Sequence, residues 1–190
     1  PEGSLRLHDL EHVMPHIVKV IALFREKAKP IIHIVRLYEK DGSNADLCRR
    51  WHIERGKLSA AVPGTWGSQL VDCTNINGAE LDPPLLLSQG VQEIGPHEFI
   101  VYKPRFNAFH RTSLNSFLKS ISINSVIIVG LTFPNCIRAT QLGAADHDYR
   151  VGLVASACTE PDELGLRAMA AQGVQLLEVD ALADLLSGAT

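Results

Sequence analysis

Apolar residues recur along this chain with two spacings, one typical of helices and one typical of strands. Between Asp9 and Lys29 they fall three or four positions apart, which predicts a helix with Asp9 as its N-cap and Pro30 as its stop. Short apolar runs rich in β-branched residues predict strands at 31–35, 99–103, 126–131, 151–155 and 174–178. Helical spacing returns between these runs and predicts helices at 112–121, 135–147 and 161–172, and a last helix from Asp180.

Strands that alternate with helices predict right-handed βαβ units, and hence a mostly parallel, doubly wound sheet with helices on both faces. Residues 37–97 interrupt this alternation. They are mostly polar and carry turn signals such as Asp41-Gly42 and Pro63-Gly64, which predicts a long irregular insertion. No repeat or linker divides the chain, so residues 1–190 are expected to form one domain. Ligands bind beyond the carboxyl ends of parallel strands, so the functional residues are expected there.

Composition narrows the classes of function. The chain has 190 residues, 46% hydrophobic and 21% charged, with a net charge of −3, so neither nucleic acid nor a membrane surface is an expected partner. No apolar run reaches the length of a membrane span, and no signal peptide is visible. The four cysteines are scattered along the chain, which favours a location in the reducing cytoplasm. The eight histidines form no H-E-x-x-H or D-x-H-x-x-H motif, and no strand precedes a G-x-G-x-x-G motif or a P-loop. We therefore expect no metal and no cofactor.

Cys136 lies where the strand that ends at Gly130 passes into a helix, and this position can activate a thiol. Unpaired backbone N–H groups and the positive end of the helix dipole both stabilise a thiolate there. The alternative is a small buried side chain, the commonest fate of an intracellular cysteine, and position alone does not decide between the two. Cys48, Cys73 and Cys158 have no helix N-terminus behind them, so the structural interpretation is favoured for each.

Lys103 closes the strand that begins at Phe99 and is expected at the same edge of the sheet as Cys136. A solvated strand end is the ordinary interpretation. Beside the thiol, however, its ammonium group would lower the thiol pKa and could pass a proton to a leaving group. Arg36 and Arg105 could each bind a substrate carboxylate through paired hydrogen bonds. The candidates for a substrate pocket, for which loop packing or solvation is the alternative, are Trp66, Arg105, Phe106, Phe109 and Asn135.

Three motifs give the chain a family resemblance. The strongest is Gly130-Leu-Thr-Phe-Pro-Asn-Cys-Ile-Arg-Ala-Thr140, followed by Gly143-Ala-Ala-Asp-His-Asp-Tyr-Arg-Val151. The second is Val101-Tyr-Lys-Pro-Arg-Phe-Asn-Ala-Phe-His-Arg-Thr-Ser-Leu114, and the third is Pro63-Gly-Thr-Trp-Gly67. These motifs, together with Pro1-Glu-Gly-Ser-Leu5 at the start, stand in the order that the family shows. Over nearly its whole length the chain therefore resembles the isochorismatase-like cysteine hydrolases.

The resemblance implies a three-layer α/β/α fold and an Asp-Lys-Cys catalytic triad. Cys136 matches the nucleophile and Lys103 the lysine. The family's cis peptide matches Leu131–Thr132, and the backbone N–H groups of Thr132 and Cys136 are then the implied oxyanion hole. Pro134 departs from the family pattern and offers no N–H group.

The triad aspartate has no match within the chain. The family carries it at the end of a first, central strand, just before the segment that matches Pro1-Glu-Gly-Ser, so it is expected upstream of residue 1. The alternative is a protein without that strand, whose sheet would have two unpaired edges. Asp9 and Glu11 lie on the following helix and do not fit the motif.

The implied reaction is hydrolysis of a small amide or related carbonyl C–N bond through a thioester on Cys136. The lack of D-x-H-x-x-H argues against the nicotinamidase branch, and Pro63-Gly-Thr-Trp66 resembles the branch with ureidoacrylate-type and N-carbamoyl amidohydrolases. Two alternatives remain: an isochorismatase-type ether hydrolase, and a catalytically silent binding or assembly protein on the same fold. The expected partners are a small-molecule substrate and further copies of the chain, in a dimer or tetramer.

Overall fold

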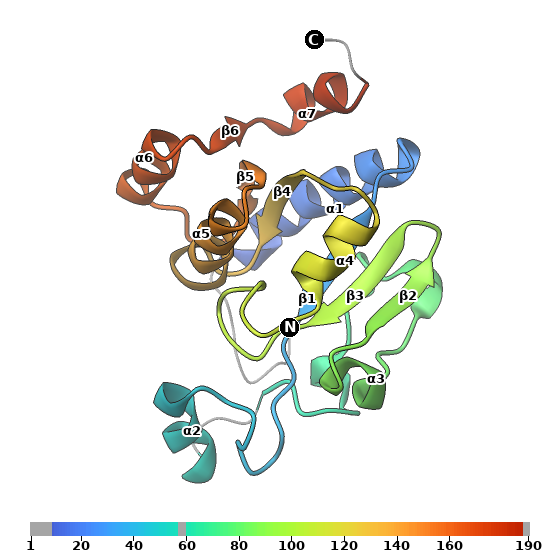
Figure 1. Ribbon diagram of the computed structural model, residues 1–190, viewed down its shortest axis with the longest axis vertical. Coiled ribbons are helices and arrows are strands. Elements are labelled where there is room, and N and C mark those ends of the chain that lie inside the picture. The colour runs from blue at the N-terminus through green and yellow to red at the C-terminus, as the bar shows by residue number, and fades with distance from the viewer. Residues whose placement is uncertain (1–8, 57–59, 188–190) are drawn as a thin grey trace.

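The computed structural model describes residues 9–56 and 60–187, in which strands and helices alternate along the chain (Figure 1). The segment Pro1–Leu5, which contributes to the family resemblance, lies outside the described residues. The helices are α1 (Leu10–Glu26), α2 (Leu47–Glu54), α3 (Pro83–Leu87), α4 (Leu114–Ser120), α5 (Arg138–Asp146), α6 (Glu163–Ala171) and α7 (Val179–Leu186). The strands are β1 (Ile31–Val35), β2 (Val91–Gly95), β3 (Glu98–Tyr102), β4 (Ser125–Gly130), β5 (Arg150–Cys158) and β6 (Gln175–Leu177).

These strands form two three-stranded sheets, with the orders β1-β3-β2 and β4-β5-β6. All neighbours are parallel except β2, which runs antiparallel to β3. Among the described residues β1 pairs only with β3, and β4 pairs only with β5. Within the described part of the chain, each sheet therefore has one inner edge, β1 or β4, without a hydrogen-bonded neighbour.

Apolar clusters on both faces nevertheless join the two sheets. On one face α1 packs through Val13, Ile17 and Val20 against a cluster that includes α7 and β5, and Ile31 of β1 and Ile127 of β4 both pack against it. On the other face α4, α5 and α6 cover a second cluster, which alternate residues of β1 and β4 also contact. Figure 1 shows α4 in front of the strands and α1 behind them. The three-layer α/β/α prediction is confirmed.

The insertion between β1 and β3 is more regular than its polar composition predicts. It contains α2, α3, two short 3-10 turns at Trp66–Ser68 and Ile76–Gly78, and the antiparallel strand β2. The expectation of an irregular segment throughout residues 37–97 was therefore wrong. Short apolar patches inside the insertion, with Leu81 and Leu86 at their centre, pack against Ile100 and Tyr102 and cover the outer face of β3.

Candidate active site

The turn that carries Cys136 is tightly anchored between β4 and α5. Gly130 ends β4 with φ at 120°, a backbone conformation that favours glycine. Phe133 follows in a π-helical turn (η3, Phe133–Ile137); its ring is fully buried and packs against Gly165 of α6. The Phe133 backbone N–H donates to the carbonyl of Thr159, at 3.0 Å. Wide π-helical turns are frequent at functional sites, and this one replaces the first turn of the helix predicted at 135–147.

Two features of this turn bear on the predicted oxyanion hole. The Leu131–Thr132 peptide bond is cis. Asn135 donates from Nδ2 to Thr132 Oγ1, at 3.2 Å, and so links the two ends of the turn at the surface. An oxyanion hole made by the Thr132 and Cys136 N–H groups stays a prediction.

Lys103 lies directly after β3, and its side chain reaches the same place. Only 6% of the residue is exposed, its Nζ donates to the Phe106 carbonyl at 2.8 Å, and its charge acts on the Cys136 thiol. Helix α5 holds this arrangement, because Thr140 Oγ1 accepts from the Ala108 N–H at 3.1 Å and donates to the same Phe106 carbonyl at 3.4 Å. The loop that positions Lys103 and the helix that follows Cys136 are thus one packed unit.

The electrostatics of this pair favour a thiolate. Burial raises the pKa of Cys136, but the charge and hydrogen bond of Lys103, together with the charge of Arg36, outweigh it and the pKa falls below its ordinary value. For Lys103, burial lowers the pKa, and Arg36 and Arg49 lower it further, against the opposing effect of the thiolate. A lysine with a lowered pKa gives up its proton more readily than a solvated lysine, which suits it to proton transfer.

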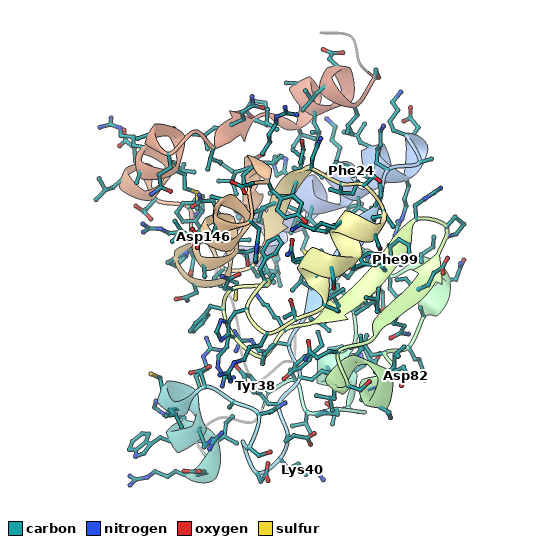
Figure 2. All side chains as sticks on the ribbon, viewed as in Figure 1. Phe24, Tyr38, Lys40, Asp82, Phe99 and Asp146 are labelled. Atoms are coloured by element: carbon teal, nitrogen blue, oxygen red, sulfur yellow. The ribbon has the colours of Figure 1, made fainter. Side chains whose placement is uncertain are left out.

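Arg36 and Arg49 form a basic cluster beside the pair, and the two side chains share the same partners. Both donate from Nη1 to the Tyr38 hydroxyl, at 2.7 Å and 2.9 Å, and both stack on the Phe106 ring, with centroid distances of 5.1 Å and 4.6 Å. Figure 2 shows the labelled Tyr38 between α2 and the body of the protein, amid nitrogen-tipped side chains. Sequence reasoning considered Arg36 but missed Arg49, because no local pattern shows that α2 folds back onto the sheet edge.

The structure brings only some of the predicted pocket residues to Cys136. Phe106 lies at the site, and the guanidinium groups of Arg36 and Arg49 both contact its ring. Arg105 is partly buried and donates from Nη1 to the carbonyls of Asn44 and Pro104, at 3.0 Å and 2.9 Å, so part of its donor capacity is committed to the loops. Asn135 is exposed on the turn itself.

Phe109 and Trp66 are placed elsewhere. Phe109 is 7% exposed and packs in the core against His147 and Tyr149, because the buried loop turns its ring inward, so the structure does not support it as a pocket wall. Trp66 is 77% exposed, and no contact recorded for the described residues joins it to Cys136.

The described residues contain no carboxylate partner for Lys103, no metal-binding cluster and no membrane-spanning helix. No carboxylate among them is recorded in a hydrogen bond or ion pair with Lys103. No group of three or more His, Cys, Asp or Glu side chains in the described part of the chain could hold a metal ion. Within that same part, none of the helices has the length and apolar character needed to cross a membrane.

A three-layer α/β/α fold with a cysteine and a lysine paired at the carboxyl edge of its parallel strands defines a class, the isochorismatase-like hydrolases. The Isochorismatase domain model matches residues 85–181, just over half of the chain. The chain belongs to this family.

Individual relatives agree with this assignment. A protein of Arabidopsis thaliana described as a probable inactive nicotinamidase is 30% identical over 137 residues, which is 72% of this chain and 61% of the relative. An isochorismatase family protein of Desulfovibrio vulgaris has a solved structure with a TM-score of 0.80 and 26% identity, covering 98% of this chain and 90% of that one. N-carbamoylsarcosine amidase of Thermoplasma acidophilum, at 19% identity and a TM-score of 0.72 over 94% of this chain and 89% of that one, shares the fold.

Proposed function

We propose that the protein is a cysteine-dependent hydrolase that cleaves a small amide or related carbonyl C–N bond. The observation that carries the proposal is the partly buried Cys136 thiol, whose pKa is lowered by the buried Lys103 ammonium group beside it. A structural cysteine gains nothing from a buried lysine at this position. Burying a lysine is costly, and such a cost is common where the charge serves the chemistry.

The proposed reaction has two steps. The Cys136 thiolate attacks the amide carbonyl and forms a tetrahedral intermediate, whose oxyanion the N–H groups of Thr132 and Cys136 would accept. The C–N bond then breaks, Lys103 gives a proton to the leaving ammonia or amine, and a thioester remains. Water attacks the thioester, releasing the carboxylic acid and regenerating the thiol.

The triad carboxylate would come from a strand between β1 and β4. The inner edges of the two sheets are each unpaired among the described residues, and apolar residues of both strands contact the same clusters. A parallel strand there would end between Val35 and Gly130. Lys103 follows the strand paired with β1, and Cys136 follows β4, so a carboxylate at the end of such a strand would lie beside both.

The test is ammonia release from a panel of small amides and ureides by the full-length protein. We expect turnover of at least one compound and a loss of at least about a thousandfold in Cys136→Ala, as for other nucleophile deletions. Cys48→Ala is the matched control, since Cys48 is exposed on α2 and should be dispensable. Equal turnover by Cys136→Ala and the parent protein would exclude the mechanism.

A catalytically silent binding protein is the second candidate, because the Arabidopsis relative is described as probably inactive and no carboxylate is recorded with Lys103 in the described residues. Isochorismate belongs in the panel, since hydrolysis of that vinyl ether alone would indicate the ether-hydrolase alternative. A reactive Cys136 with no turnover of any compound would favour the silent protein.

A further inference from the structure

The backbone carbonyl of Phe106 is the point at which Lys103 is held. Lys103 Nζ donates to this carbonyl at 2.8 Å, and the lysine is only 6% exposed, so the carbonyl takes the place of water beside the ammonium group. A buried ammonium group that lacks such an acceptor is costly, and its charged form is disfavoured. The position of the Phe106 carbonyl therefore decides where the charge of Lys103 lies.

Thr140 of α5 holds the same carbonyl from the helix side. Its Oγ1 donates to the Phe106 carbonyl at 3.4 Å and accepts from the Ala108 N–H at 3.1 Å. Ala108 is 1% exposed, so its N–H group depends on the threonine hydroxyl for an acceptor. One hydroxyl thus fastens the loop at two backbone groups, one on each side of Asn107.

Close packing one turn further along α5 makes this reach possible. Gly143 lies on the same face of the helix as Thr140, and a Cβ at Gly143 would collide with the side-chain amide of Asn107. The missing side chain lets the loop approach the helix closely, so the short side chain of Thr140 can meet backbone groups of the loop. The helix that follows Cys136 thus grips the loop that follows Lys103.

Phe106 contacts all three cations of the site. Its carbonyl accepts from Lys103, and its ring lies against the guanidinium groups of Arg36 and Arg49. These are also the charged groups that act on the pair: Cys136, Arg36 and Arg49 on Lys103, and Lys103 and Arg36 on Cys136. A contact that fixes Phe106 therefore fixes the charges around the thiol.

We propose that Thr140 is a positioning residue for the catalytic pair: its hydroxyl fixes Phe106 and so holds the Lys103 ammonium group beside Cys136. The partners of the hydroxyl are backbone groups of the loop, so Thr140 acts on the chemistry only through Phe106 and Lys103. This inference rests on the proposed function, to which it adds a residue that governs the reactivity of the nucleophile.

The pH dependence of Cys136 alkylation tests the proposal without requiring turnover. Iodoacetamide forms a C–S bond with the thiolate and releases iodide, and peptide mass spectrometry reads Cys136 apart from the other cysteines. Thr140→Val removes the hydroxyl, so the ammonium group is held less firmly and the midpoint should move to higher pH by about half a unit or more. Thr140→Ser keeps the hydroxyl and should retain the parent midpoint. An unmoved midpoint in Thr140→Val, or the same shift in Thr140→Ser, would overturn the proposal.

Thr112 supplies a matched control on the same loop. Its Oγ1 donates to the Ala108 carbonyl at 2.6 Å and accepts from the Leu114 N–H at 3.3 Å, and neither bond involves Phe106. Thr112→Val and Thr140→Val should lower the midpoint of urea unfolding to a similar extent, but Thr140→Val alone should move the alkylation profile. An equal shift in Thr112→Val would show that general loosening of the loop is the cause, and would refute the proposal. Thr140→Ala gives the same comparison if the valine variant does not fold.

The amide panel separates this inference from the proposed function. With a compound that the protein hydrolyses, Thr140→Val should lower kcat several-fold and leave KM unchanged, because the hydroxyl positions the pair and not the substrate. A change confined to KM would contradict the positioning role. With no turnover of any compound the hydrolase fails, while the alkylation profiles of the Thr140 and Thr112 variants still decide what Thr140 does.

Discussion

Replacing Lys103 with methionine should slow the alkylation of Cys136 sharply while leaving the protein folded. Opposite charges in hydrogen-bond contact interact by about 4 kcal/mol at an effective dielectric constant of 20, equivalent to roughly a thousandfold in the thiolate population. Two facts make the expected fall in the thiolate population smaller than this. Arg36 remains beside the thiol in the variant, and burial already lowers the pKa of Lys103, so its protonated form is less favoured. We take about a tenfold fall in the iodoacetamide rate at neutral pH as the minimum.

The pH dependence of Cys136 alkylation should shift in a defined direction in the Lys103→Met variant. Because Lys103 lowers the pKa of Cys136, the thiolate persists to lower pH in the parent protein, and the alkylation profile of Lys103→Met should move to higher pH. Methionine fills the volume of a buried lysine without its desolvation cost, so the melting temperature should not fall by much. Lys119→Met, at an exposed position on α4, controls for the loss of one charge. A profile for Lys103→Met that coincides with the parent's would refute the pairing.

The other predictions concern the support of the site and the remaining thiols. Gly143→Ala would push a Cβ into the Asn107 amide, whose Oδ1 accepts from the Phe109 N–H at 2.8 Å. The substitution should therefore lower the free energy of unfolding by about 1–3 kcal/mol and slow the alkylation of Cys136. The control Gly67→Ala, with open space around the new Cβ, should change neither quantity. Glu98→Gln should cost about 2 kcal/mol in urea unfolding, because it breaks a buried pair with Arg25 and His33, while Glu93→Gln on the exposed side of β2 should be neutral. Burial alone would raise the pKa of Glu98, but hydrogen bonds from Arg25 and His33 lower this pKa overall. The ionised Glu98 therefore stabilises the protein above the ordinary carboxyl pKa, and this stabilisation is lost as the pH falls through the lowered pKa. The Glu98→Gln variant should consequently lose less stability in acid than the parent protein. Burial raises the pKa of Cys158 to about 12, so it should resist iodoacetamide until the protein unfolds, and labelling of Cys158 in the native state at the rate of exposed Cys73 would contradict its placement.

The chemistry at the sheet edge could be predicted where it depends on local sequence. A β-branched run that ends at Gly130 and gives way to helical spacing places Cys136 at a strand-to-helix turn, whatever surrounds it. The run that ends at Tyr102 likewise places Lys103 after a strand. Since parallel strands share one carboxyl edge, the two residues could be expected together at that edge.

The insertion and the pocket could not be predicted in the same way. Cys48 and Arg49 lie in a polar stretch without a helical apolar face, yet α2 forms there with Asp46 as its N-cap, whose Oδ1 accepts from the Arg49 N–H at 3.1 Å. Phe109 looked like a loop aromatic near the site and packs in the core instead. Side chains on loops take their direction from distant contacts, such as that between Thr140 and Ala108, which no short pattern encodes.

The sequence by itself determined most strands and helices outside residues 37–97, the layered α/β class and the places of Lys103 and Cys136 after two of the strands, because backbone preferences and apolar periodicity act over a few residues. The tertiary structure alone decided what surrounds that pair. It brought β1 and β4 against the same apolar clusters, folded α2 back so that Arg49 contacts Phe106 and Tyr38, and placed Lys103 and Arg36 where their charges lower the pKa of Cys136. Charge and burial depend on groups far apart in the chain, so the electrostatic surroundings of Cys136 are decided at the level of the fold.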